Sequence, residues 1–177
     1  TFQGSMGKVR YTQEALRSSA EAWNNTPVVL YHPMRNGQPI PAEDADPSQI
    51  LGFLDNVNVQ NGALRGEVFL DMQKLNAQGL ESIASTIRNG SMDVSTGLYP
   101  EQTGPGDSEC DIECLSMTPD HLALLPGGQG ACSWPDCGIP RTNKQKESVM
   151  TNKQDDREEG IADPLSFNRS NEEYQQI

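Results

Sequence analysis

The chain contains only two histidines, His32 and His121, and each stands at one end of a short apolar run. His32 follows residues 28–31, and His121 precedes residues 122–125. Imidazole is the side chain whose charge changes most readily near neutral pH, and it is the most common general acid or base in enzymes. The two histidines are therefore candidates for proton transfer. The alternative is that both are half-buried structural imidazoles.

Ser95 lies between the two histidines in the sequence and is a candidate nucleophile. Alternation along the predicted strand 92–99 places Ser91, Asp93, Ser95 and Gly97 on one face. Gly97 has no Cβ, so a substrate backbone could approach closely at this point. Serine two residues before glycine is also an everyday strand sequence, and the pattern by itself is weak evidence for catalysis.

Four cysteines, Cys110, Cys114, Cys132 and Cys137, form the patterns C-x3-C and C-x4-C. Two pairs of thiolates could hold a zinc ion in a tetrahedron. Cys110 and Cys114 fall on one predicted strand, however, where positions i and i+4 are roughly 13 Å apart. This separation disfavours zinc, and no metal or other cofactor is expected. Disulfides are rare in cytoplasmic proteins, so four reduced thiols are expected.

The elements that must position these residues are predicted to be mixed α and β. Helical spacing predicts a helix within 11–23, with Thr12 as a cap, and a second helix is predicted over 72–88 with a break at Gly79. Asn61-Gly62 predicts a hairpin within 50–71. Further strands are expected over 28–31, 92–99, 110–117 and 122–125, with a long loop over 33–49. This order predicts an α+β domain or a partly closed barrel.

The composition sets the class of protein. Hydrophobic residues make up 34% of the 177 residues, and 25 acidic residues against 13 basic ones give a net charge of −12. Such a charge repels phosphate backbones and anionic lipid, so we expect neither a nucleic-acid partner nor a membrane. No apolar run approaches the roughly 20 residues of a membrane span, and no signal peptide is visible. A soluble intracellular protein is expected.

The chain divides into three parts by composition. Residues 1–5 read as the remnant of an expression tag. Residues 6–140 are predicted to form the folded domain. Residues 141–177 are polar, have no sustained apolar period, and are predicted to be a flexible tail or linker.

Three short motifs follow one another in the chain: Pro27-Val28-Val29-Leu30-Tyr31-His32-Pro33, Asp93-Val94-Ser95-Thr96-Gly97-Leu98-Tyr99 and Asp120-His121-Leu122-Ala123-Leu124-Leu125-Pro126. In this order they resemble the capsid maturation (prohead) proteases of tailed bacteriophages, and the segment Gly130-Ala131-Cys132-Ser133 is also similar. The fold of these proteases is shared with the herpesvirus assembly protease, assemblin. The resemblance covers roughly residues 7–140, with 63 positions from His32 to Ser95 and 26 from Ser95 to His121.

The resemblance implies a serine endopeptidase in which Ser95 is the nucleophile, His32 the general base and His121 the orienting third member. A neutral imidazole as third member supplies no full negative charge, so a slow protease is expected. Asp120 adjoins His121 but should point to the opposite face of a regular strand, so it is left out of the triad. Gly128, Gln129 and Gly130 are the implied oxyanion hole. No arginine stands there, unlike in assemblin-like enzymes.

The resemblance also implies a small, mostly antiparallel β-barrel flanked by helices. The implied substrates are scaffold and major capsid protein segments, and the protein itself, inside the prohead in the host cytoplasm. Whether the protein forms homo-oligomers is left open. The alternative from another class is a non-enzymatic capsid- or scaffold-associated protein in which Ser95 and both histidines are structural. The third hypothesis for the function is a small zinc-binding module.

Overall fold

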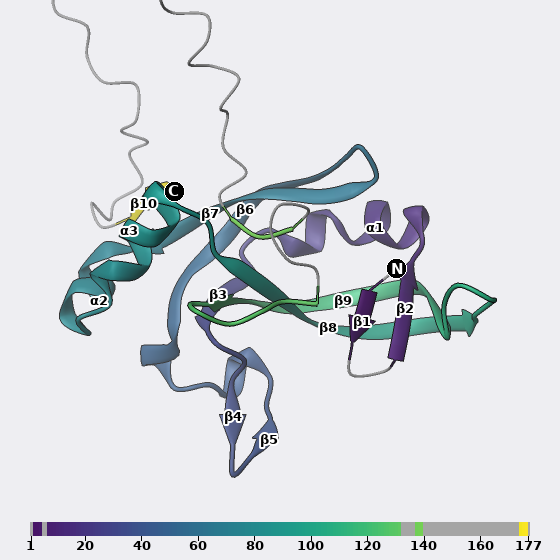
Figure 1. The fold of residues 1–177 in the computed structure, drawn as a ribbon, viewed down its shortest axis with the longest axis horizontal. Helices are drawn as coiled ribbons and strands as arrows, with labels where there is room; N and C mark the ends of the chain where they lie inside the picture. The colour runs from purple at the N-terminus through teal and green to yellow at the C-terminus, as the bar shows by residue number, and fades with distance from the viewer. Residues whose placement is uncertain (1, 5–6, 132–136, 140–173, 177) are drawn as a thin grey trace, which may run out of the picture.

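A computed structural model describes residues 2–4, 7–131, 137–139 and 174–176 of the chain (Figure 1). Most of the predicted tail, 141–177, lies outside the described residues. So do residues 1, 5 and 6 of the N-terminal segment. Among the described residues, no helix is long and apolar enough to cross a membrane.

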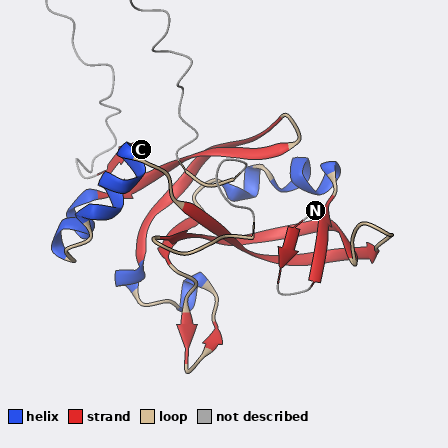
Figure 2. Ribbon diagram, in the orientation of Figure 1, coloured by secondary structure: helices blue, strands red, loops and turns tan. Residues whose placement is uncertain are grey.

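Strands dominate the structure (Figure 2). The main sheet has the order β1-β2-β9-β3-β6-β7-β10, and β8 pairs with the other side of β9. Its strands are β1 (Phe2–Gly4), β2 (Gly7–Tyr11), β3 (Pro27–Leu30), β6 (Ile50–Gln60), β7 (Ala63–Asp71), β8 (Asp93–Pro105), β9 (Ile112–Leu125) and β10 (Tyr174–Gln176). All pairs are antiparallel except β2–β9 and β3–β9.

The fold class is therefore α+β with a mostly antiparallel sheet, as predicted. The barrel is not closed, because the strand order ends at β1 and β10, which do not pair with each other in the described part of the chain. A second, two-stranded sheet consists of β4 (Met34–Arg35) and β5 (Gln38–Pro39) and projects away from the main sheet in Figure 1.

The helices form where local sequence signals predict them. Thr12 caps α1 (Gln13–Ser19) by accepting a hydrogen bond from the Ala15 N–H, and the 3₁₀ helix η1 (Glu21–Trp23) follows. The predicted helix over 72–88 is divided into α2 (Met72–Ala77) and α3 (Glu81–Asn89). Gly79, with φ of 68°, lies between them, so the predicted break is confirmed.

One face of the sheet carries the main hydrophobic core. Apolar residues of η1, α2 and α3 pack there against alternating residues of the strands. Buried members of this core are Trp23, Leu75, Ile83, Ile87, Val28, Leu51, Leu70, Leu122 and Leu124. On the opposite face, Val29 and Ala123 pair across β3 and β9 and are completely buried.

Two strands expected over 110–117 and 122–125 are one continuous strand, β9. The prediction of two separate strands was wrong, because pairing with β8 continues through residues 118–121. Pro119 is accommodated opposite Leu98, next to a register shift in the pairing with β8, and proline is tolerated at such bulges. This irregularity lies directly beside His121.

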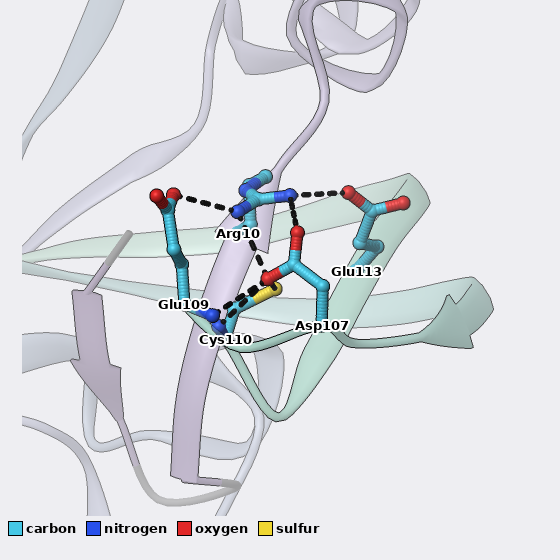
Figure 3. Close-up of polar contacts among 5 residues, drawn as sticks. All are labelled: Arg10, Asp107, Glu109, Cys110 and Glu113. Atoms are coloured by element: carbon cyan, nitrogen blue, oxygen red, sulfur yellow. Dashed lines mark hydrogen bonds and ion pairs between the residues drawn. The ribbon is translucent and has the colours of Figure 1, made fainter.

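An ion cluster joins β2 to the turn between β8 and β9 (Figure 3). The Arg10 guanidinium contacts Asp107 at 2.8 Å, Glu113 at 2.9 Å and Glu109 at 3.1 Å. Hydrogen bonds from Arg10 are the main reason that the pKa of Asp107 falls to about 2. The cluster fixes β2 against the end of the long β8–β9 pair.

Candidate active site

The two histidines lie in contact. His32 Nδ1 and His121 Nε2 are 2.7 Å apart, and the ring planes meet at 67°. His121 belongs to β9, whereas His32 stands just beyond the end of β3, which is the parallel neighbour of β9. Tyr31 has a φ of 57°, so the chain turns there before His32. Residues 89 positions apart are thus joined by one hydrogen bond.

Asp120 extends this chain, which the sequence analysis did not predict. Its Oδ2 lies 2.5 Å from His121 Nδ1. The expectation that Asp120 points away from His121 was wrong, because the alternation of a regular strand does not hold here. In the pairing with β8, Gly97 faces His121 and Leu98 faces Pro119, so Asp120 is an extra residue in β9. A bulge of this kind redirects a side chain.

The carboxylate of Asp120 also binds the loop that follows His32. Both of its oxygens accept from the Ala42 N–H, at 3.2 and 3.1 Å, at the start of the 3₁₀ helix η2 (Ala42–Asp44). Ala42 is buried, and the side chains of Asp120 and His121 are only 13% and 6% exposed. The loop over 33–49 therefore packs beside the histidine pair.

These contacts determine which ring nitrogens carry protons. An ionised carboxylate can only accept, so His121 Nδ1 donates to Asp120. In neutral His121, Nε2 is then an acceptor, and His32 Nδ1 must donate to it. Neutral His32 is left with a basic lone pair on Nε2. This is the tautomer that a general base needs.

Burial lowers the pKa of His32, and the neighbouring His121 lowers it further. His32 is partly buried, whereas His121 is buried. A base whose pKa lies below its ordinary value is neutral, and so able to accept a proton, at pH 7.

Ser95 lies on the same face of the sheet as His121. Ser95 pairs with Ala123 and Gly97 pairs with His121, and directly paired residues share a face. Ser95 is partly exposed. No hydrogen bond joins its hydroxyl to either histidine in the described part of the chain.

Gly97 has a different role from the one that the sequence suggested. A Cβ on Gly97 would lie 2.2 to 2.6 Å from atoms of the His121 ring. The space above Gly97 is therefore filled by His121 rather than left open for a substrate. Only glycine at this position leaves room for the His121 ring against β8.

A pocket of about 450 Å³ lies beyond Ser95 on β8, on the side away from His121. Asp93 pairs with Leu125 in the next same-face row after Ser95 and Ala123. The pocket is lined by Thr86, Ser91, Met92, Asp93 and residues 125–129. Ser95 is thus between the histidine pair and this pocket.

The implied oxyanion turn forms part of the wall of this pocket. The Gly128 N–H donates to Leu125 O at 3.0 Å, and the Gly130 N–H donates to Asp93 Oδ2 at 3.0 Å. Two of the three implied donors are therefore occupied. For the N–H of Gln129, the described residues provide no acceptor.

The cysteines do not converge. Cys110 and Cys114 are free and buried, and burial raises the pKa of Cys114. Cys137 is disulfide-bonded, so the expectation of four reduced thiols is wrong. Cys132 lies outside the described residues. Within the described ranges, no group of three or more metal-binding side chains is placed to hold an ion.

Asp120 is the site residue that sequence reasoning missed, although a signal was present. Thr118-Pro119 interrupts an otherwise apolar strand, and a proline inside a strand marks a bulge or an edge. The regular alternation of side chains between the two faces of a strand does not predict where the residues directly after such a proline point.

Comparison with known proteins gives no relative. No protein-family model, curated protein or solved structure matches the chain.

Proposed function

We propose that this protein is a serine endopeptidase of phage capsid maturation, with Ser95 as nucleophile and His32 as general base. The observation that carries the proposal is the hydrogen-bonded chain His32–His121–Asp120, which leaves the basic lone pair of His32 on Nε2. The motif resemblance supplies the biological setting. We also propose that the fold is related to the assemblin-like barrel, although the sheet described here is open.

The proposed reaction begins when His32 Nε2 takes the hydroxyl proton of Ser95 as Oγ attacks the scissile carbonyl carbon. The resulting imidazolium of His32 is stabilised through His121, which in turn donates to the Asp120 carboxylate. The tetrahedral intermediate collapses with breakage of the C–N bond, and His32 returns its proton to the leaving amine. Water then repeats these steps on the acyl-enzyme and regenerates Ser95.

Asp120 changes the expectation of a slow enzyme. The third member, His121, has no charge of its own, but a carboxylate 2.5 Å behind it supplies one. We therefore propose a linear arrangement of four residues, in which His121 transmits the effect of Asp120 to His32.

The oxyanion is proposed to be stabilised at the turn over 127–130, with the N–H of Gln129 as the main donor. The turn lines the pocket beside Ser95, and glycines flank Gln129 on both sides. The substrates are proposed to be scaffold and major capsid protein segments, together with the protein's own residues after 140. Cleavage would take place in the prohead, within the host cytoplasm.

One observation favours the non-enzymatic alternative. The Ser95 hydroxyl makes no hydrogen bond with His32 in the described part of the chain, and His121 is buried enough to be purely structural. Catalytic hydrogen bonds are often long before substrate binds, so this observation does not decide between the two functions.

The decisive experiment compares the wild type with Ser95→Ala and with Ser91→Ala, which changes an exposed serine just before β8. Intact mass is followed over time, and a fluorophosphonate probe tests for a reactive serine. We expect the wild type and Ser91→Ala to shorten and to be labelled, and Ser95→Ala to do neither while its melting temperature is unchanged. Equal truncation or labelling of Ser95→Ala would exclude Ser95 as the nucleophile.

A further inference from the structure

Within the described residues, the outer edge of β7 is paired at only one place. β7 pairs with β6 on its inner side over most of its length, from Ala63 to Leu70. On its outer side, β10 pairs antiparallel with Phe69, Leu70 and Asp71. An unpaired strand edge presents free N–H and C=O groups and is a template for another extended chain.

The occupied part of this edge, from Phe69 to Asp71, overlaps the apolar end of the strand. Val68 and Leu70 are buried, and Phe69 stacks on Phe53 with ring centroids 5.2 Å apart. Nearer the hairpin tip the same strand carries Arg65, Gly66 and Glu67, which are not paired on the outer side in the described structure. Charged residues and glycine at an edge discourage strand addition, so the sequence of β7 restricts docking to one end.

The strand that pairs with this edge, β10, comes from the C-terminal end of the chain, and the length of the preceding segment decides whether it can reach β7. Ile139 is held to Met92 by two backbone hydrogen bonds, of 2.7 and 2.9 Å. Residues 140–173 connect Ile139 to β10, and 34 residues can span up to about 110 Å when extended. The segment is long enough to reach β7 of the same molecule, and Figure 1 shows the C-terminus beside β7 and α3.

We propose that the edge of β7 from Phe69 to Asp71 is a docking site for an extended peptide strand. Its resident occupant is the chain's own C-terminal segment, Tyr174–Gln176, bound in the same molecule. Recognition is by main-chain hydrogen bonds, the mode known as strand addition. Because the segment is covalently connected to the domain, its effective concentration at β7 is high, and pairing of three residues is sufficient for it to bind.

Docking at β7 is separate from the candidate active site. β7 and β9 are separated in the sheet by β3 and β6. The docking proposal therefore does not depend on proteolysis, and an experiment that contradicts one of the two proposals does not contradict the other.

The test is hydrogen exchange of the full chain carrying Ser95→Ala, which prevents any self-cleavage from removing the segment. Tyr174→Pro and Gln175→Pro are combined, since one of two adjacent residues points its N–H toward β7 and proline has none. The matched control carries Asn152→Pro and Lys153→Pro. Among amides 69–71, we expect those whose N–H points toward β10 to exchange at least about threefold faster in the first variant and unchanged in the control.

A second measurement distinguishes docking within one molecule from docking between two. Exchange of amides 69–71 and the molar mass by light scattering are recorded over a range of protein concentrations. Protection that is independent of concentration in a monomer supports the proposal. Unchanged exchange in the proline variant would overturn it, and so would protection that appears only with a dimer, which would assign the edge to a second copy.

Discussion

The Asp120 carboxylate determines the direction of each hydrogen bond in the histidine pair. It can only accept, so it assigns the donor at His121 Nδ1 and thereby the donor at His32 Nδ1. The same carboxylate holds the Ala42 N–H of the neighbouring loop. One side chain thus connects the chemistry of the site with the position of the loop.

Asp120→Asn is expected to lower the cleavage rate by roughly 10²- to 10⁴-fold, the usual contribution of acid–base catalysis. The asparagine oxygen can still accept from Ala42, while its NH₂ can donate to His121 Nδ1. That change reverses both tautomers and leaves His32 Nε2 protonated. Cleavage assays with nitrogen NMR of the rings measure the effect. Glu43→Gln, an exposed neighbour on η2, is the control. An active Asp120→Asn with unchanged tautomers would contradict the assignment.

Activity is expected to fall as the pH decreases, with a midpoint below 6.5. Burial, and then the neighbouring His121, lower the pKa of His32, so its neutral form persists to lower pH than in a free imidazole. A lowered pKa also means that His32 contributes stability above about pH 6.5, and that this contribution is lost as the pH falls through the folded-state value. A pH–rate profile and an NMR titration of His32 check both statements. A rate midpoint that differs from the NMR midpoint of His32 would show that His32 is not the base, and an NMR midpoint above 6.5 would contradict the lowered pKa.

At the scale of elements, sequence signals succeeded where they are local. Asn61 and Gly62 adopt φ of 50° and 78° and form the predicted hairpin turn. Gly79 divides the predicted helix for the same reason. Such residues act through their own backbone preferences, so no knowledge of distant pairing is needed.

The same signals failed where a distant strand decides the result. The continuity of β9 and the bulge at Asp120 depend on pairing with β8, and local preferences contain no register. Sequence resemblance brought His32, Ser95 and His121 together as a set, and the structure places the two histidines in contact. Asp120 was excluded by an argument from regular alternation, which the bulge invalidates.

The anchoring of β2 is expected to weaken in acid. The pKa of Asp107 is lowered from 3.8 to about 2, mainly by hydrogen bonds from Arg10. A lowered carboxyl pKa contributes stability above pH 3.8, which is lost as the pH falls toward 2. The melting temperature of Arg10→Gln should therefore differ most from that of wild type above pH 4, and less at lower pH.

A matched control for this measurement is Arg35→Gln. Arg35 donates to the backbone oxygen of Asp44, which does not titrate. Its effect on the melting temperature should not change between pH 5 and pH 3. If the difference between wild type and Arg10→Gln were also constant over this range, Asp107 would not be the partner responsible.

For the whole molecule, the net charge of −12 is the property that acts over the longest distance. Residues 141–177 contain 8 acidic and 6 basic residues, so a net charge of about −10 belongs to the first 140 residues. A molecule with this charge attracts cationic chains from solution and repels anionic ones. The proposed protease should therefore encounter basic substrate segments more often than acidic ones.

This attraction should disappear as salt is added. We expect kcat/KM for a peptide flanked by lysines to fall between about 20 and 300 mM salt, since the screening length shortens to less than about 10 Å above 0.1 M. For the same peptide flanked by glutamates, kcat/KM should rise, and kcat should change little for either peptide because screening acts on encounter. Cleavage is measured by mass spectrometry with Ser95→Ala as the blank. Equal salt responses of the two peptides would show that substrate selection depends on short-range contacts at the site and not on the charge of the molecule.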